Sequence, residues 1–317
     1  MAGTRGLGSL GTERHGGKVP SGIEGRSFAT PGPAGRETWH EPAGGDDLHA
    51  DPPTAQQRAE TLVREFAERP GGGVFSRILR SRVAEGLLIR IYNPASINQT
   101  VASLCGPAAL LFEVATRDPE TYVRYVIALY ETGTGRLREI VVTAGNDLKE
   151  YDPGRKVEAS DWIALASLRD SENYFFDYQD ANDAFAGITL PGELEDWFRK
   201  VGYAEVVNEA RVLVDETEAS IQRADAFFQA GFRVCLFIHG NMLEKSTEST
   251  GSATPNHWVV QTSSVAMGLL PIGTEMVKTI SLRIYTWGEG RRLVPKEGFL
   301  RLDHFLDNYY GFVAARY

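Results

Sequence analysis

The sequence predicts an α+β fold, with helices in the first part of the chain and strands in the last. Apolar residues recur at helical spacing in segments before residue 230 and alternate in segments after it. The late apolar segments are also rich in β-branched and aromatic residues, and Gly, Pro and Asn bound them. Helices and strands that are separated along a chain are typical of α+β architecture, not of alternating βαβ units. We therefore expect a helical half at about 54–230 and an antiparallel β half at about 231–317.

The individual elements follow from spacing and from helix signals. Pro70 and the glycines after it end the first expected helix, and Asp118-Pro119 supplies an N-cap and a first-turn proline for the fourth. Helices are expected at 55–69, 75–85, 108–116, 120–132, 192–201 and 210–230, and strands at 87–92, 232–238, 257–263, 279–285 and 311–315.

Residues 1–53 form a compositionally distinct leader. They are rich in Gly, Pro, Ser, Thr and Asp and contain almost no large aliphatic side chains, so they cannot offset the entropy cost of ordering. We expect a disordered leader at 1–53 and one folded catalytic domain at 54–317. The leader lacks the apolar core of a secretory signal peptide. The expected location is therefore cytoplasmic, or outside the cell by a non-classical, contact-dependent secretion route.

Composition restricts the classes of function. The formal net charge of −9 argues against nucleic acid as a partner, since a phosphate-binding surface is basic. No apolar stretch reaches the roughly 18 residues of a membrane span, so a soluble protein is expected. Two cysteines cannot build a disulfide framework, and neither has histidines at metal-site spacing. We expect no metal and no cofactor.

Cys105 has the local setting of a nucleophile. It directly precedes an expected helix with Pro107 as its first residue, so its sulfur faces unpaired backbone N–H groups and the positive end of the helix dipole. Such a setting favours the reactive thiolate. Gly106 is expected to let a substrate carbonyl approach the backbone. Gln99, six residues earlier, is placed to help the Cys105 N–H bind an oxyanion.

His257 is the candidate base. It begins an expected strand after a Gly/Ser/Thr-rich loop, where its ring can face a cleft. It follows Cys105 by 152 residues (257 − 105), close to the ~130–150 of papain-type enzymes. Two other sites receive plainer interpretations: Cys235, flanked by Val234 and Leu236, is expected in the core, and His239-Gly240-Asn241 as a turn at a strand end.

Three blocks together resemble the signatures of papain-like cysteine peptidases. They are Gln99 with Cys105-Gly106, then His257-Trp258-Val259-Val260, then Thr286-Trp287-Gly288. The motifs Cys-Gly-Pro-Ala-Ala and His-Trp-Val-Val are similar to those of bacterial members of the family, such as bacteriocin-leader peptidases and the thiol-hydrolase effectors of secretion systems. The resemblance covers about twenty residues. It implies a papain-like fold, with a cleft between a helical half that carries the nucleophile and a β half.

The resemblance also implies roles for individual residues. Cys105 attacks an acyl carbon, His257 accepts and returns the proton, and Gln99 stabilises the oxyanion. Tyr285 occupies the position at which the family commonly has the Asn that orients the histidine. Candidates for that orienting role are therefore the Tyr285 hydroxyl, Thr286, Gln261 and Glu289, while Trp287 is placed to shield the histidine from water.

The expected function is a thiol hydrolase, a cysteine peptidase or amidase. Its substrate is expected to be a protein, a peptide or the peptide of peptidoglycan. Its expected role is that of a bacterial effector or toxin. A cognate inhibitor is a further candidate partner. Two alternatives stay open. One is a glutamine deamidase, transglutaminase or peptidoglycan amidase with the same thiol chemistry, and the other is a catalytically inactive binding module of this fold.

Overall fold

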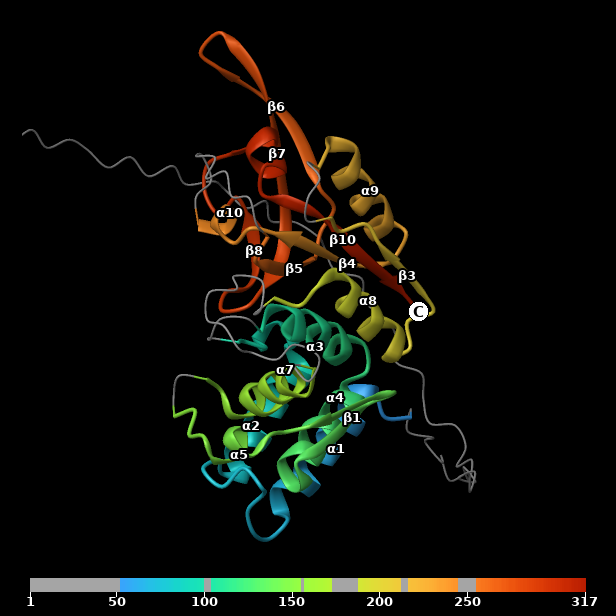
Figure 1. Ribbon diagram of the computed structural model, residues 1–317, viewed down its shortest axis with the longest axis vertical. Coiled ribbons are helices and arrows are strands. Elements are labelled where there is room, and N and C mark those ends of the chain that lie inside the picture. Colours follow the sequence, from blue (N-terminus) through green and yellow to red (C-terminus); the bar gives the residue numbers. More distant parts are fainter. Residues whose placement is uncertain (1–51, 100–103, 155–156, 173–187, 212–215, 245–254) are drawn as a thin grey trace, which may run out of the picture. The chain divides into compact units, whose positions relative to one another are not determined.

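A computed structural model describes residues 52–99, 104–154, 157–172, 188–211, 216–244 and 255–317. Contacts divide the chain into Met1–Ala50 and Asp51–Tyr317, and every described residue belongs to the second unit. The leader predicted at 1–53 therefore lies almost entirely outside the described residues. The second unit mixes helices with an antiparallel sheet, which confirms the α+β class (Figure 1).

The helices lie mainly in the first half of this unit. They are α1 (Ala55–Glu68), α2 (Arg80–Tyr92), the 3₁₀ turn η1 (Pro94–Ser96), α3 (Cys105–Arg117), α4 (Pro119–Thr132), α5 (Asn146–Glu150), α6 (Ala159–Asp161), the π turn η2 (Trp162–Ala166), α7 (Ser167–Glu172), α8 (Pro191–Lys200), α9 (Glu218–Gln229), α10 (Asn241–Glu244) and α11 (Leu302–Leu306).

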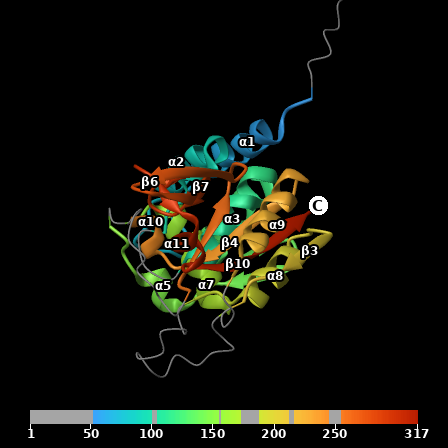
Figure 2. The same ribbon diagram turned by 90° about the horizontal axis from the view of Figure 1, so that it is seen from above.

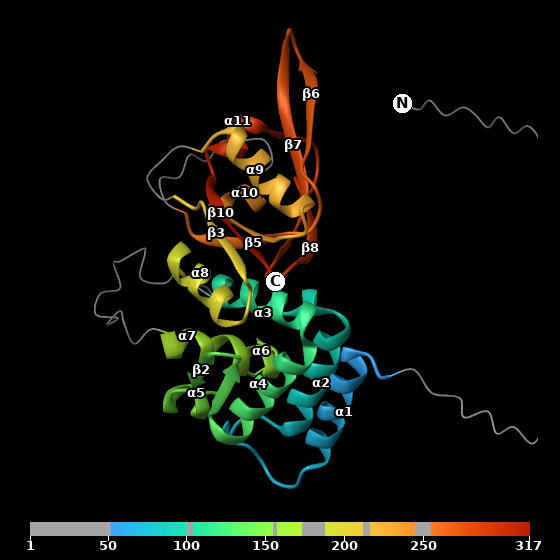
Figure 3. The same ribbon diagram turned by 90° about the vertical axis from the view of Figure 1, so that its right-hand side faces the viewer.

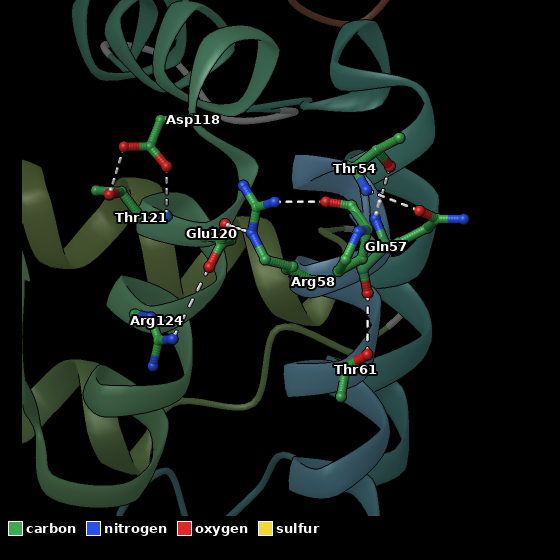
Figure 4. Close-up of polar contacts among 9 residues, drawn as sticks. Thr54, Gln57, Arg58, Thr61, Asp118, Glu120, Thr121 and Arg124 are labelled. Carbon is green, nitrogen blue, oxygen red and sulfur yellow. Dashed lines mark hydrogen bonds and ion pairs between the residues drawn. The ribbon is translucent and has the colours of Figure 1, made fainter. Parts of the chain in front are cut away.

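Local capping explains where two of these helices begin. Thr54 accepts the backbone N–H of Gln57, and the Gln57 side chain accepts the Thr54 N–H, which completes a capping box for α1 (Figure 4). Asp118 accepts the N–H of Thr121 at the start of α4. The ion pair between Arg58 and Glu120, 2.6 Å apart, joins the first turns of α1 and α4 (Figure 4). Because the Arg58 side chain is half exposed, this pair adds little to stability.

The strands form a two-stranded hairpin and a larger antiparallel sheet. The hairpin pairs β1 (Thr134–Leu137) with β2 (Ile140–Thr143). The larger sheet has the order β3-β10-β4-β5-β7-β6, with β8 and β9 also pairing with β7. Its strands are β3 (Glu205–Asn208), β4 (Arg233–Ile238), β5 (His257–Gln261), β6 (Ala266–Ile272), β7 (Glu275–Thr286), β8 (Gly290–Val294), β9 (Leu300–Arg301) and β10 (Tyr309–Arg316).

Around β4, β5 and β10 the side chains of the larger sheet alternate between two hydrophobic clusters, so both faces are covered there. Cys235 and Phe237 of β4, with Trp258 of β5, join the core cluster that contains α3 and α8. Val234, Leu236 and Ile238 of β4 point to the other face, where they join a second hydrophobic cluster with Ile221 of α9. The contacts of α9 with β4 and β10 place it on this second face (Figures 1 and 2). The first face therefore packs against the helix that begins at Cys105.

Several expected elements are confirmed, and others were wrong. The strands expected at 232–238, 257–263, 279–285 and 311–315 correspond to β4, β5, β7 and β10. The strand expected at 87–92 is instead the second half of α2, because Val83, Leu87 and Ile91 form a helical stripe that is buried against the helical layer. The sheet begins at β3, earlier than the expected boundary near 231, because β3 pairs with the last strand of the chain.

The β6–β7 hairpin extends from the rest of the sheet (Figures 1 and 3). It exposes apolar side chains. Every residue of β6 is exposed, and Leu269 reaches 59%. The exposed large side chains of this hairpin are Met267, Leu269, Leu270, Ile272 and Met276. In the described part of the chain, no helix is both long enough and apolar enough to cross a bilayer.

Leu269→Ala is expected to change the free energy of unfolding by less than about 0.5 kcal/mol, because an exposed side chain loses little burial. Urea denaturation provides the measurement. Leu236→Ala, at a buried position of β4, is the matched control and should cost several times as much. A large loss for Leu269→Ala would show that the hairpin packs against something in solution.

Candidate active site

Cys105 is the first residue of α3, with Leu104 as the N-cap, so the helix begins two residues earlier than expected. Its side chain is 3% exposed and belongs to the core cluster that also contains Ile97, Trp258 and Tyr285. The backbone N–H groups that favour the ionised sulfur are those of Trp258, Gly106 and Cys105 itself. Trp258 directly follows His257. The thiol therefore lies beside the start of β5, where the predicted base is located.

Burial dominates the electrostatics of this thiol. It raises the pKa of Cys105, and the three backbone N–H groups only partly oppose the rise. The sequence led us to expect a lowered pKa and a resting thiolate. The pKa shift of Cys105 is upward because the sheet encloses the N-terminus of α3. The removal of water destabilises the thiolate more than the helix stabilises it.

His257 is the first residue of β5, and its ring is almost completely buried, at 1% exposure. Burial lowers the pKa of His257 to about 3, so the imidazole is neutral. Its Nε2 is hydrogen-bonded to Oγ1 of Thr286 at 2.9 Å. The Trp287 ring stacks on the imidazole with the ring centres 3.7 Å apart, the packing expected for a shield against water.

The other ring nitrogen of His257 has no hydrogen-bond partner among the described residues. A buried polar atom without a partner calls for an explanation, and a catalytic role is one of the explanations. When Nε2 holds the ring hydrogen and donates it to Thr286, Nδ1 carries a free lone pair. His257 can therefore accept a proton at Nδ1.

Thr286 has the contact that orients the histidine, and Tyr285 does not. The Tyr285 hydroxyl instead donates to the backbone carbonyl of Ile97 at 2.7 Å. The two other candidates are engaged elsewhere, because Gln261 donates to Asp225 and Glu289 pairs with Arg292. Of the four alternatives that the sequence left open, Thr286 is the one that the structure shows hydrogen-bonded to the His257 ring.

Gln99 follows η1 and is 3% exposed. Its Oε1 has no hydrogen-bond partner within the described residues. The segment before it meets the turn that contains Trp287: the Ala95 carbonyl lies against Gly290, and the Asn98 side chain approaches Gly288. The structure thus gathers the 95–99 segment, the start of α3 and the turn after β7 around β5, although Gln99 Oε1 and His257 Nδ1 both lack a hydrogen-bond partner among the described residues.

Gly106 is packed against Thr189. The Thr189 side chain occupies the space that a Cβ at Gly106 would need, so no larger residue fits at this position. The Thr189 carbonyl also accepts the Trp258 indole N–H at 2.8 Å. Thr189 therefore connects α3 to β5, a contact between distant segments that sequence spacing could not indicate.

Cys235 lies in the core and His239 at the end of a strand, as the sequence predicted for each. Cys235 is fully buried in β4, where burial raises the pKa of its thiol well above the usual value. Both cysteines are free. His239 follows β4, and its Nε2 lies 3.1 Å from the Asn256 amide nitrogen, so the two residues hold the strand ends together.

Cys105 and His257 are both enclosed in this structure. Within the described ranges, no three His, Cys, Asp or Glu side chains are grouped as a metal site requires. Because Cys105 and His257 are both buried, a substrate carbonyl can reach the sulfur only if the atoms that cover it move. The chain matches no model of a known protein family, and none of the curated proteins is similar to it.

Proposed function

We propose that this chain is a thiol hydrolase of the papain-like type, a cysteine peptidase or amidase whose cleft lies between the helical layer and the sheet. Cys105 is the nucleophile, His257 the base and Gln99 the oxyanion donor. The observation that carries the proposal is the approach of the Cys105 thiol to the backbone N–H of Trp258, next to a neutral histidine whose Nδ1 has no partner among the described residues.

The directions of the two pKa shifts favour general-base chemistry over a resting ion pair. Burial keeps the thiol of Cys105 protonated and the imidazole of His257 neutral. The proton then passes from sulfur to Nδ1 as the sulfur attacks the acyl carbon. Thr286 holds the ring through Nε2, and Gln99 with the Cys105 N–H stabilises the oxyanion. The C–N bond of the amide then breaks, His257 returns its proton to the leaving amine, and water hydrolyses the thioester to the free acid and the Cys105 thiol.

The proposed substrate is the amide of a protein, a peptide or peptidoglycan. A role as a secreted effector or toxin, opposed by a cognate inhibitor, is part of the same proposal and rests on the resemblance of the three sequence blocks. Deamidation or transamidation would use the same nucleophile and base, and release of ammonia without chain cleavage identifies either reaction.

One observation favours a second candidate, the catalytically inactive binding module. Both the nucleophile and the base are buried, and the pKa of the thiol is raised, not lowered. A cysteine in such a setting behaves as a small apolar side chain. The chemical reactivity of the Cys105 thiol distinguishes the binding module from the enzyme.

Alkylation by iodoacetamide at pH 7, mapped to each cysteine by mass spectrometry, tests the proposal. Cys105 is expected to react at least tenfold faster than Cys235, on the order of the activation that a neighbouring base gives. Cys235 is the internal control, because both thiols are buried and both have raised pKa values. The comparison therefore measures activation and not exposure.

His257→Gln is expected to reduce the alkylation rate of Cys105 by roughly tenfold and leave that of Cys235 unchanged. Circular dichroism would verify that the variant is folded. Equal rates for the two cysteines in the wild-type protein, or no effect of His257→Gln, would favour the inactive module.

A further inference from the structure

The short segment 96–98 is held by side chains from three separate elements. The Ser96 carbonyl accepts from Arg90 of α2 at 3.2 Å, the Ile97 carbonyl accepts from Tyr285 of β7 at 2.7 Å, and the Asn98 N–H donates to Asp161 of α6 at 2.9 Å. A segment that is neither strand nor long helix depends on such bonds for its backbone position. Gln99 is the next residue.

The side chains that hold this segment are themselves held rigidly. Arg90 and Asp161 form a buried two-bond ion pair, with nitrogen–oxygen distances of 2.6 and 2.5 Å, and Arg90 also donates to the Gly86 carbonyl at 3.1 Å. The Tyr285 ring stacks on Phe112 of α3, with ring centres 4.0 Å apart and planes 9° from parallel. Tyr285 therefore connects the helix of the nucleophile to the segment before Gln99.

We propose that Tyr285, supported by the Arg90–Asp161 pair, is a positioning residue that fixes the backbone before Gln99 and so aims the Gln99 amide at the oxyanion. This inference rests on the proposed function. Gln99 Oε1 has no partner within the described residues, so among these residues the backbone bonds of 96–98 and the packing around Gln99 hold its side chain. The resemblance implies an Asn that orients the histidine, and in this proposal Thr286 has that role. Tyr285 acts instead on the segment before Gln99.

The test compares two reactions of the same sulfur. With p-nitrophenyl acetate, the sulfur of Cys105 bonds to the acetyl carbon, p-nitrophenolate leaves, the thiol proton passes to His257, and water hydrolyses the thioester to acetate. This reaction passes through an oxyanion. With iodoacetamide, the sulfur displaces iodide from a CH₂ carbon, and no oxyanion forms. Only the first reaction uses Gln99.

Tyr285→Phe removes the hydroxyl and keeps the ring. We expect it to lower the rate of p-nitrophenolate release about threefold to tenfold, the effect of one neutral hydrogen bond, and to leave the alkylation of Cys105 within about twofold of wild type. Gln99→Ala should lower release by ~10²–10³. Adding Tyr285→Phe to Gln99→Ala should cause no further loss, since both act through one amide.

Tyr125→Phe is the matched control. Tyr125 is also buried, and its hydroxyl donates to a backbone carbonyl, that of Ala164, at 2.8 Å, away from the site. This variant should leave both reactions unchanged, and thermal unfolding of both variants would verify that they fold.

Three results would overturn the positioning role. They are an unchanged rate of release in Tyr285→Phe, an equal loss in both reactions, which indicates a general structural role, and losses that multiply in the double variant. A folded wild-type protein that releases no p-nitrophenolate above the level of Cys105→Ala would contradict the proposed function itself, and the positioning role with it.

Discussion

Asp161→Ala is expected to lower the free energy of unfolding by about 3–5 kcal/mol, because it leaves the Arg90 guanidinium buried without its charge partner. Asp161 is fully buried, and its carboxylate also accepts the Asn98 N–H. The variant therefore loses a charge pair and an anchor of the segment before Gln99. Urea denaturation monitored by circular dichroism gives the measurement.

An exposed ion pair provides the control for Asp161→Ala. Asp196 and Lys200 lie one turn apart on α8, with both side chains about half exposed. Asp196→Ala should cost only about 0.3–0.5 kcal/mol. The double variant Arg90→Met with Asp161→Leu should regain part of the loss, since apolar side chains carry no desolvation penalty. Equal costs for Asp161→Ala and Asp196→Ala would show that water reaches the Arg90–Asp161 pair.

His257 is expected to contribute about 3 kcal/mol to the change in folding stability between pH 7 and pH 4. Its pKa is about 3 in the folded protein, against an ordinary value of 6.5 for an exposed histidine, so the unfolded chain binds the extra proton below pH 6.5. The stability that depends on neutral His257 is therefore complete above pH 6.5 and is lost progressively as the pH falls toward 3.

Glu113 of α3 is expected to oppose this effect. Burial raises the pKa of the Glu113 carboxyl to about 7 from 4.5, although Arg233 lies 3.2 Å away. The folded protein therefore binds the extra proton between pH 4.5 and 7, and this contribution to stability is complete below pH 4.5 and lost as the pH rises through 7. Because the two contributions have opposite signs, the wild-type curve alone cannot separate them.

Two variants separate the contributions by urea denaturation at several values of pH from 4 to 8. Relative to wild type, His257→Gln should gain stability as the pH falls below 6.5, because it lacks the histidine that the unfolded chain protonates. Glu113→Gln should lose stability relative to wild type over pH 7 to 4.5. A difference between His257→Gln and wild type that does not change with pH would show that His257 is solvated in the folded protein.

Local sequence signals were sufficient for the parts of the site that depend on neighbours in the chain. The proline after Cys105-Gly106 and the cap at Asp118 predicted α3 and α4, and the alternating residues after His257 predicted β5. These signals work because a capping bond, a restricted proline and a side-chain period act over a few residues. Local signals were wrong where burial overrode them, as in the apolar segment at 87–92, which continues α2.

The sequence by itself predicted a helix next to Cys105, although with a start two residues too late, and a strand that begins at His257, because both depend on local backbone preferences. Only the tertiary structure decided that Thr286 bonds to His257 while Tyr285 bonds to Ile97, and that the pKa of Cys105 rises. Which residue of β7 meets which partner depends on strand register and on the packing of segments nearly two hundred residues apart. The sign of a pKa shift depends on how completely the folded chain excludes water, and no spacing in the sequence encodes that.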